Sequence, residues 1–178
     1  MTVHEERLRE PQRPHAVVLG CSDSRMPVEL VLGQSLGDLF VIRVAGNVAQ
    51  PSQIGSVEFA VERFGTRLVV VMGHTECGAV TSAVEELLRP TAARSMSLRA
   101  IVDLIRPAVE PLVERFRSDP TALVQGAIRA NIAASIEALR EGSPLLRQMM
   151  SNGLSIVGAE YELATGVVTF FDGAEEPV

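Results

Sequence analysis

Residues 67–73 read RLVVVMG and run directly into His74, and this stretch decides the expected fold. A short valine-rich run that ends at a glycine is typical of a strand covered on both faces. Two further runs have the same character, AVVLG at residues 16–20 and LFVIRV at residues 39–44. We therefore expect three buried strands of the kind found in parallel sheets.

The segments that separate and follow these runs carry apolar residues at helical spacing. The expected helices cover residues 52–64, 78–89, 97–117 and 121–140. Gly65 supplies a stop for the first of them. Pro107 and Pro111 should break or kink the third, because proline cannot donate a helical hydrogen bond and clashes with the preceding turn.

Strands that alternate with helices predict an α/β fold with a mainly parallel central sheet flanked by helices. Residues 154–161 and 167–171 add two more expected strands, and the turn residues at 164–166 favour an antiparallel hairpin at one edge. We expect a single domain over residues 1–178. Its first 11 residues should form an irregular amino-terminal arm.

Composition narrows the function classes. The chain has 178 residues, a net charge of −6, 47% hydrophobic residues and a mean hydropathy of +0.22. With no basic stripe and few aromatic residues, nucleic-acid binding is not expected. No apolar run reaches the roughly 18 residues of a membrane span, and the amino terminus has no secretory core, so we expect a cytoplasmic protein. The apolar composition favours an oligomer.

Three residues that can bind a metal follow two of the expected strands. Cys21 follows residues 16–20, while His74 and Cys77 follow residues 67–73. If these strands are neighbours in a parallel sheet, the three side chains meet at its carboxyl edge. Two thiolates and one imidazole are good zinc ligands, and three protein ligands are typical of a catalytic zinc with an open fourth position. Glu76, between two of the ligands, is expected to be a solvated loop carboxylate.

Asp23 and Arg25 complete the first motif, CSDSR, and two arrangements are open. Asp23 lies close enough to Cys21 to bind the metal itself as a fourth ligand. Alternatively, the planar guanidinium of Arg25 grips the carboxylate at two points and holds it away from the metal. In the second arrangement Asp23 accepts a hydrogen bond from zinc-bound hydroxide.

These motifs resemble those of the β-carbonic anhydrases, plant-like subclass. The resemblance rests first on GCSDSR at 20–25 and GHTECGAV at 73–80. It extends through LGDLFVIRVAGN at 36–47, GSVEFAV at 55–61 and IVGAEYELATGVVTFF at 156–171, so it covers nearly the whole chain.

The resemblance implies one zinc ion per chain on Cys21, His74 and Cys77, with Asp23 and Arg25 as a catalytic dyad. It also implies that Gln12 orients the substrate, and that an apolar pocket for carbon dioxide is formed by Phe40, Ala45 and Phe59. In this family part of each pocket comes from a neighbouring subunit, so a homodimer or tetramer is implied.

The chain departs from the family pattern in two places. Phe59 stands where the plant-like subclass usually has a tyrosine. Only 11 residues precede Gln12, where relatives usually carry one or two helices that wrap the partner. A shortened arm is therefore expected.

The expected reaction is the reversible hydration of carbon dioxide to bicarbonate by zinc-bound hydroxide. Two other functions fit the same residues. One is a zinc hydrolase of carbonyl sulfide or carbon disulfide, and the other is a non-catalytic zinc-binding assembly protein.

Overall fold

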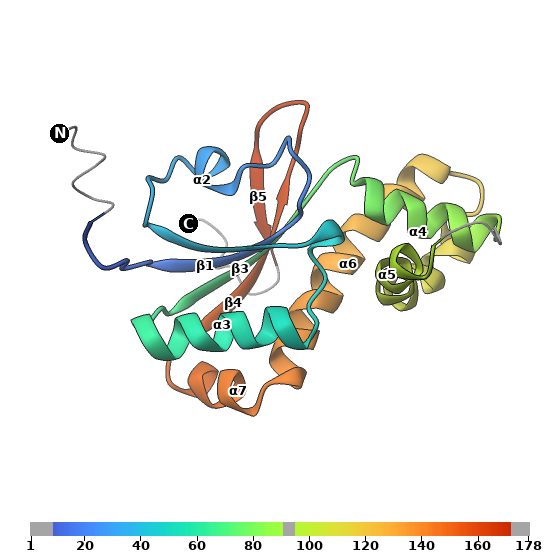
Figure 1. The fold of residues 1–178 in the computed structure, drawn as a ribbon. Coiled ribbons are helices and arrows are strands. Elements are labelled where there is room, and N and C mark those ends of the chain that lie inside the picture. Colours follow the sequence, from blue (N-terminus) through green and yellow to red (C-terminus); the bar gives the residue numbers. More distant parts are fainter. Residues whose placement is uncertain (1–8, 91–94, 172–178) are drawn as a thin grey trace.

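The structure is a computed structural model that describes residues 9–90 and 95–171 (Figure 1). Most of the expected amino-terminal arm, residues 1–8, lies outside the described residues. Residues 9–14 contain no helix or strand.

A five-stranded sheet forms the centre of the molecule, in the order β2-β1-β3-β4-β5. Its strands are β1 (Ala16–Gly20), β2 (Leu39–Arg43), β3 (Leu68–His74), β4 (Ser155–Tyr161) and β5 (Val168–Phe171). The first four strands of this order are parallel, and β5 pairs antiparallel with β4. Every residue of β1 is buried, which explains its continuous apolar sequence. The predicted α/β class and the edge hairpin are confirmed.

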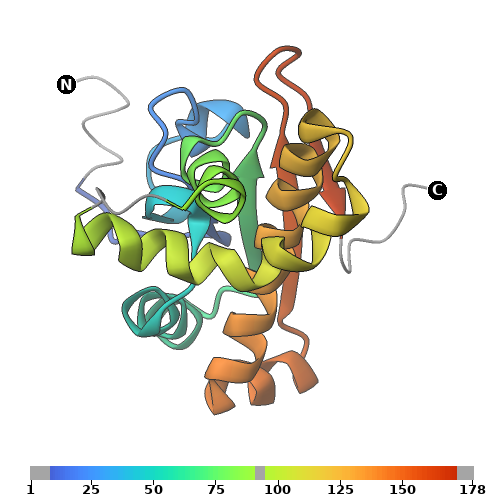
Figure 2. The same cartoon turned by 90° about the vertical axis from the view of Figure 1, so that its right-hand side faces the viewer.

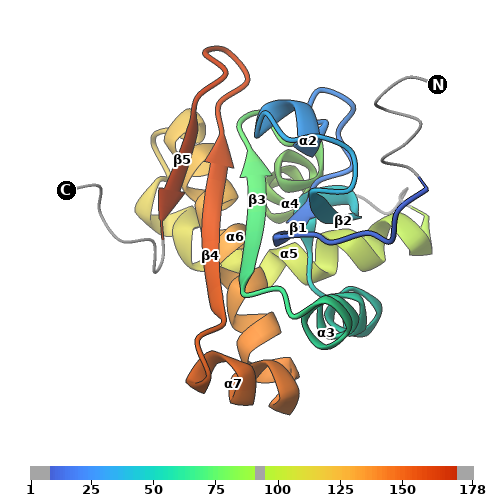
Figure 3. The ribbon, with the colours of Figure 1, turned by 90° about the vertical axis from the view of Figure 1, so that its left-hand side faces the viewer.

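Helices pack against this sheet. Those of the described chain are α2 (Val28–Val31), α3 (Pro51–Phe64), α4 (Gly78–Leu88), α5 (Met96–Arg115), α6 (Pro120–Gly142) and α7 (Pro144–Ser151), with a 3-10 turn, η1 (Ala45–Asn47), after β2. In Figure 2, α5 and α6 lie in front of the sheet, and Figure 3 shows β3 and β4 side by side with α6 behind them. Gly65 ends α3 with a left-handed backbone, φ 69°, as predicted.

Pro107 and Pro111 were predicted to break or kink the third long helix, and the break does not occur, because α5 continues through both prolines. Both prolines lie on the exposed face, where water can satisfy the carbonyl groups that lose a partner. Val102, Ile105 and Val109 line the buried face. Their burial stabilises the helix by more than the missing hydrogen bonds cost.

A close contact between α6 and β3 sets the position of the carboxyl end of that strand. Ile132 of α6 is fully buried, and a Cβ atom built on Gly73 would lie 2.6 Å from its Cδ1 atom. Only glycine therefore fits at the position that directly precedes His74.

Candidate metal centre

Cys21, His74 and Cys77 form one buried cluster at the carboxyl edge of the sheet. Cys21 follows β1, His74 ends β3, and Cys77 caps the start of α4. Their ligand atoms all lie within 4.8 Å of one another, and the two Sγ atoms are 3.9 Å apart. Because β1 and β3 are parallel neighbours, their carboxyl ends meet at this point.

The hydrogen bonding of His74 prepares one ring nitrogen for a metal. Nδ1 lies 2.8 Å from the carbonyl oxygen of Thr75, so Nδ1 carries the proton and donates it there. Nε2 is buried and has no hydrogen-bond partner. A buried nitrogen lone pair without a partner is costly unless a metal takes it.

The donor set fits zinc. Two thiolates each about 2.3 Å from a tetrahedral zinc ion are about 3.8 Å apart, and the measured separation of the Sγ atoms is 3.9 Å. The hydrogen bond between the two sulfur atoms lowers the pKa of Cys21. The same contact raises the pKa of Cys77, so a cation that binds both sulfurs must displace this remaining proton.

Two features of the backbone favour negative charge on the sulfurs. The N–H of Gly46 points at the Sγ of Cys21, at 3.4 Å. α4 begins directly after Cys77, so the positive end of the helix dipole lies beside the second sulfur.

Asp23 and Arg25 form a pair beside the cluster. Nε and Nη2 of Arg25 donate to the two carboxylate oxygens at 3.0 and 2.9 Å, and the Arg25 backbone N–H adds a third bond at 2.9 Å. The hydrogen bond from Arg25 holds the pKa of the Asp23 carboxyl well below its usual range. Oδ2 of Asp23 lies 3.9 Å from Nε2 of His74. The pairing of Arg25 with the carboxylate that the second arrangement requires is present in the structure.

One residue that holds these loops was missed in the sequence. Arg43, at the end of β2, donates from Nε to the carbonyl oxygen of Cys21 (3.0 Å) and from Nη2 to that of Asp23 (2.6 Å). The sequence signal for this role was a charged residue, Arg43, near the end of an otherwise apolar predicted strand. Glu76 is a largely solvated loop carboxylate, as predicted: its side chain is 73% exposed, and it accepts a hydrogen bond from Nη1 of Arg25 at 3.2 Å.

The remaining predicted site residues do not all reach this edge. Ala45 begins η1 beside Gly46, at the metal end. Gln12 precedes β1, and Phe40 pairs in register with Val17, near the amino end of that strand. A strand of five residues spans about 13 Å, so Gln12 and Phe40 lie well away from the cysteines of their own chain.

Phe59 belongs with Phe40 and not with the cluster. The ring of Phe40 is 6.1 Å from that of Phe59 and 6.0 Å from that of Phe64. Phe59 remains 52% exposed despite these contacts. The structure therefore separates the predicted pocket residues into one at the metal end and two in an aromatic group at the opposite end of β2.

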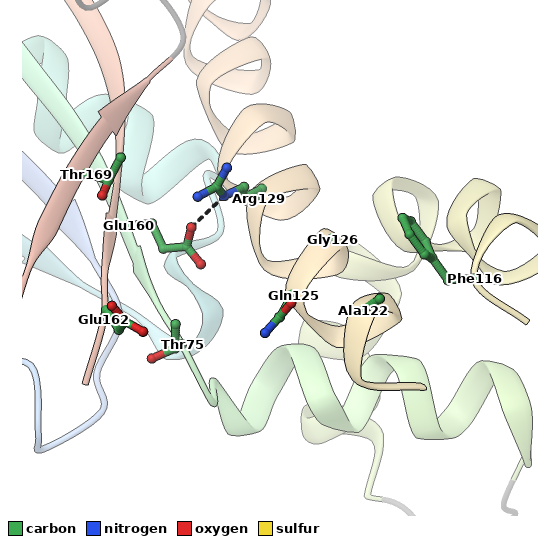
Figure 4. Close-up of a pocket in the computed structure, with 9 residues that line it drawn as sticks. All are labelled: Thr75, Phe116, Ala122, Gln125, Gly126, Arg129, Glu160, Glu162 and Thr169. Atoms are coloured by element: carbon green, nitrogen blue, oxygen red, sulfur yellow. Dashed lines mark hydrogen bonds and ion pairs between the residues drawn. The ribbon is translucent and has the colours of Figure 1, made fainter. Parts of the chain in front are cut away.

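A cavity of about 520 Å³ lies on the other side of the ligand turn (Figure 4). It is lined by the β4–β5 hairpin, by the start of α6 and by Thr75. The carbonyl oxygen of Thr75 accepts the hydrogen bond from Nδ1 of His74. An ion pair of 2.6 Å between Arg129 and Glu160 crosses the cavity. The lining includes none of the three metal-binding residues, and the cavity shares only the Thr75 turn with the metal centre.

Within the described part of the chain, none of the helices combines the length and the apolar character that crossing a bilayer requires.

A mixed sheet that gathers two cysteines and a histidine at its carboxyl edge is typical of proteins that bind a metal through three protein ligands. The sequence model of the carbonic anhydrase family matches residues 16–168. Carbonic anhydrase 2 of Mycobacterium tuberculosis is 34% identical over 164 residues, which are 92% of this chain and 77% of that protein. The chain belongs to the β-carbonic anhydrase family.

Solved structures agree with this assignment. The β-carbonic anhydrase CafA of Aspergillus fumigatus is 30% identical, with a TM-score of 0.83 over 97% of this chain and 82% of that one. The fold is also shared with a structure reported for tetrameric β-carbonic anhydrases of Sordaria macrospora. That structure is 24% identical, with a TM-score of 0.82 over 93% of this chain and 84% of that one.

Proposed function

We propose that this chain binds one zinc ion through Cys21, His74 and Cys77 and catalyses the reversible hydration of carbon dioxide to bicarbonate. The observation that carries the proposal is the buried group of two sulfurs and one unpartnered nitrogen beside a carboxylate held by arginine. Zinc bound there acts as a Lewis acid that makes hydroxide available from water near neutral pH.

Asp23 and Arg25 together orient the hydroxyl group that attacks carbon dioxide. The Asp23 carboxylate accepts a hydrogen bond from the hydroxyl group that attacks carbon dioxide, so one oxygen lone pair points at the substrate carbon. Arg25 keeps Asp23 ionised and correctly aimed, because the salt bridge depresses the Asp23 pKa. The proton released when a new water molecule is activated leaves to solvent buffer.

Gln12, Phe40 and Phe59 are proposed to serve the site of a second copy of the chain. Their distance from the cysteines of their own chain and the exposure of Phe59 support this arrangement. The amide of Gln12 donates to a carbon dioxide oxygen as negative charge develops there. The assembly is a homodimer or a tetramer of such dimers, and two unpaired cysteines are suited to the reducing cytoplasm.

Stopped-flow measurement of carbon dioxide hydration at pH 8–9 on zinc-loaded protein tests the reaction. Asp23→Asn should retain one zinc per chain but lose most of the rate, while the exposed control Asp103→Asn should keep both. Turnover of carbonyl sulfide and carbon disulfide, measured in parallel, should be slower than that of carbon dioxide. An inactive wild-type protein with a full zinc content would refute the proposal.

Hybrid assemblies test the role of the second copy. A subunit with Cys21→Ser lacks a metal site, and a subunit with Gln12→Ala lacks the proposed amide, so each variant alone should have little activity. If Gln12 acts across the interface, a mixed dimer contains one complete site and regains activity. Mixtures that stay as inactive as the separate variants would show that Gln12 serves its own chain, and a fully active Gln12→Ala variant would show that it has no role.

A further inference from the structure

We propose that Arg43 is a positioning residue that keeps Asp23 off the metal by fixing the backbone of the loop at residues 21–25. The inference rests on the proposed metal site and concerns its fourth position. If Arg43 did not hold this loop, the carboxylate would compete with water for that position.

Asp23 stands close to the place of a metal ligand. A nitrogen and an oxygen bound to one tetrahedral zinc ion, each at about 2.1 Å, are about 3.4 Å apart. Oδ2 of Asp23 is 3.9 Å from Nε2 of His74, only about half an ångström more. Carboxylates are good zinc ligands, so Asp23 is the side chain that would compete with water for the fourth position.

Arg25 cannot prevent this competition alone. It lies two residues from Asp23, so its three hydrogen bonds to that carboxylate move together with the loop. Outside the loop Arg25 contacts Glu76, through an ion pair with a carboxylate whose side chain is 73% exposed and through its longest hydrogen bond, 3.4 Å from Nη2 to the Glu76 carbonyl oxygen. An ion pair between two exposed side chains contributes little in water.

Arg43 adds a side-chain attachment of this loop to the sheet, beside the main-chain bond of 3.3 Å from the N–H of Ser22 to the carbonyl oxygen of Val44. Arg43 ends β2 in register with Gly20, the last residue of β1, and so belongs to a rigid element outside the loop. Its two bonds reach the carbonyl oxygens on either side of Ser22, at 3.0 Å to Cys21 and 2.6 Å to Asp23. Within the described residues Arg43 has no carboxylate partner, so its hydrogen bonding is devoted to this backbone.

The test uses cobalt(II) in place of zinc and thiocyanate as a probe of the fourth position. In wild-type protein, thiocyanate should replace solvent on the cobalt and change the visible spectrum. In Arg43→Met, the Asp23 carboxylate should occupy that position, so the same change should require at least about ten times more thiocyanate. In the double variant Arg43→Met with Asp23→Asn, the wild-type response should return.

A matched control is Arg67→Met, which removes another bond from an arginine to a main-chain carbonyl, 2.7 Å to Asn152, at the opposite end of the sheet. This variant should titrate like wild type. Arg43→Lys retains a single cationic donor and should give an intermediate response. It replaces Arg43→Met if circular dichroism shows that the latter is unfolded.

An Arg43 variant that titrates like wild type overturns the inference, and so does a double variant as unresponsive as the single one, because the defect then does not depend on the carboxylate. No turnover of carbon dioxide enters these measurements. The expected spectra in a protein without hydratase activity would overturn only the proposed function, while an active wild type with an indifferent Arg43→Met would overturn only the role of Arg43.

Discussion

Gly73→Ala probes the close contact between Gly73 of β3 and Ile132 of α6, directly before the metal ligand His74. A methyl group on Gly73 would lie 2.6 Å from Cδ1 and 2.8 Å from Cγ1 of Ile132, far inside van der Waals contact. Overpacking of this kind costs about 1–3 kcal/mol of unfolding free energy. For a chain of this size each kcal/mol lowers the melting temperature by about 2–4 °C.

A second substitution shows whether the clash is the cause. Ile132→Ala alone should lower the free energy of unfolding by about 2–5 kcal/mol, because it leaves a cavity in place of a fully buried side chain. In the double variant the methyl group added by Gly73→Ala occupies part of that cavity. The double variant should therefore be more stable than the sum of the two single effects predicts, by about 1 kcal/mol or more.

The assay is urea denaturation followed by circular dichroism on chelator-treated protein at one protein concentration, so that metal binding and subunit association do not differ between variants. Gly55→Ala in α3 is the control, since a Cβ there meets nothing within 4 Å, and it should be neutral or slightly stabilising. Strict additivity of the two substitutions, or a Gly73→Ala protein as stable as wild type, would refute the packing argument.

Three further predictions concern charge, helix α5 and the metal. Because Arg25 depresses the pKa of Asp23, their pairing stabilises the fold above about pH 3.9 and this contribution disappears as pH falls through the lower folded pKa. The stability difference between wild type and Arg25→Met, from urea titrations, should thus be constant between pH 8 and 5 and shrink below about pH 4. Pro111→Ala should raise stability by up to about 3 kcal/mol, seen as a higher melting temperature, since it restores a backbone donor inside α5; an unchanged value would mean that the proline costs nothing there. Chelation should lower the melting temperature, and zinc but not magnesium should restore it, because sulfur and imidazole ligands do not suit magnesium.

Much of the fold followed from local pattern. The valine-rich runs at β1 and β3 were recognisable because strands buried on both faces need apolar residues at every position. The apolar run at β2 also forms a strand, but at the edge of the sheet, where it is mostly half-buried and not buried as expected. The eight-residue helix α7 was missed, since it is too short to show a helical period and only Leu146 of it is fully buried. The expected break in α5 failed because proline propensity was weighed without the burial of the opposite face.

The sequence by itself determined which residues can bind the metal, because ligand identity and spacing are properties of short segments that each follow a strand. The tertiary structure decided which of these residues meet and in what state. Strand order and register bring Arg43 of β2 to the loop after β1, and they carry Phe40 and Phe59 away from the cysteines. These relations depend on contacts between segments distant in sequence, and no local pattern of residues encodes them.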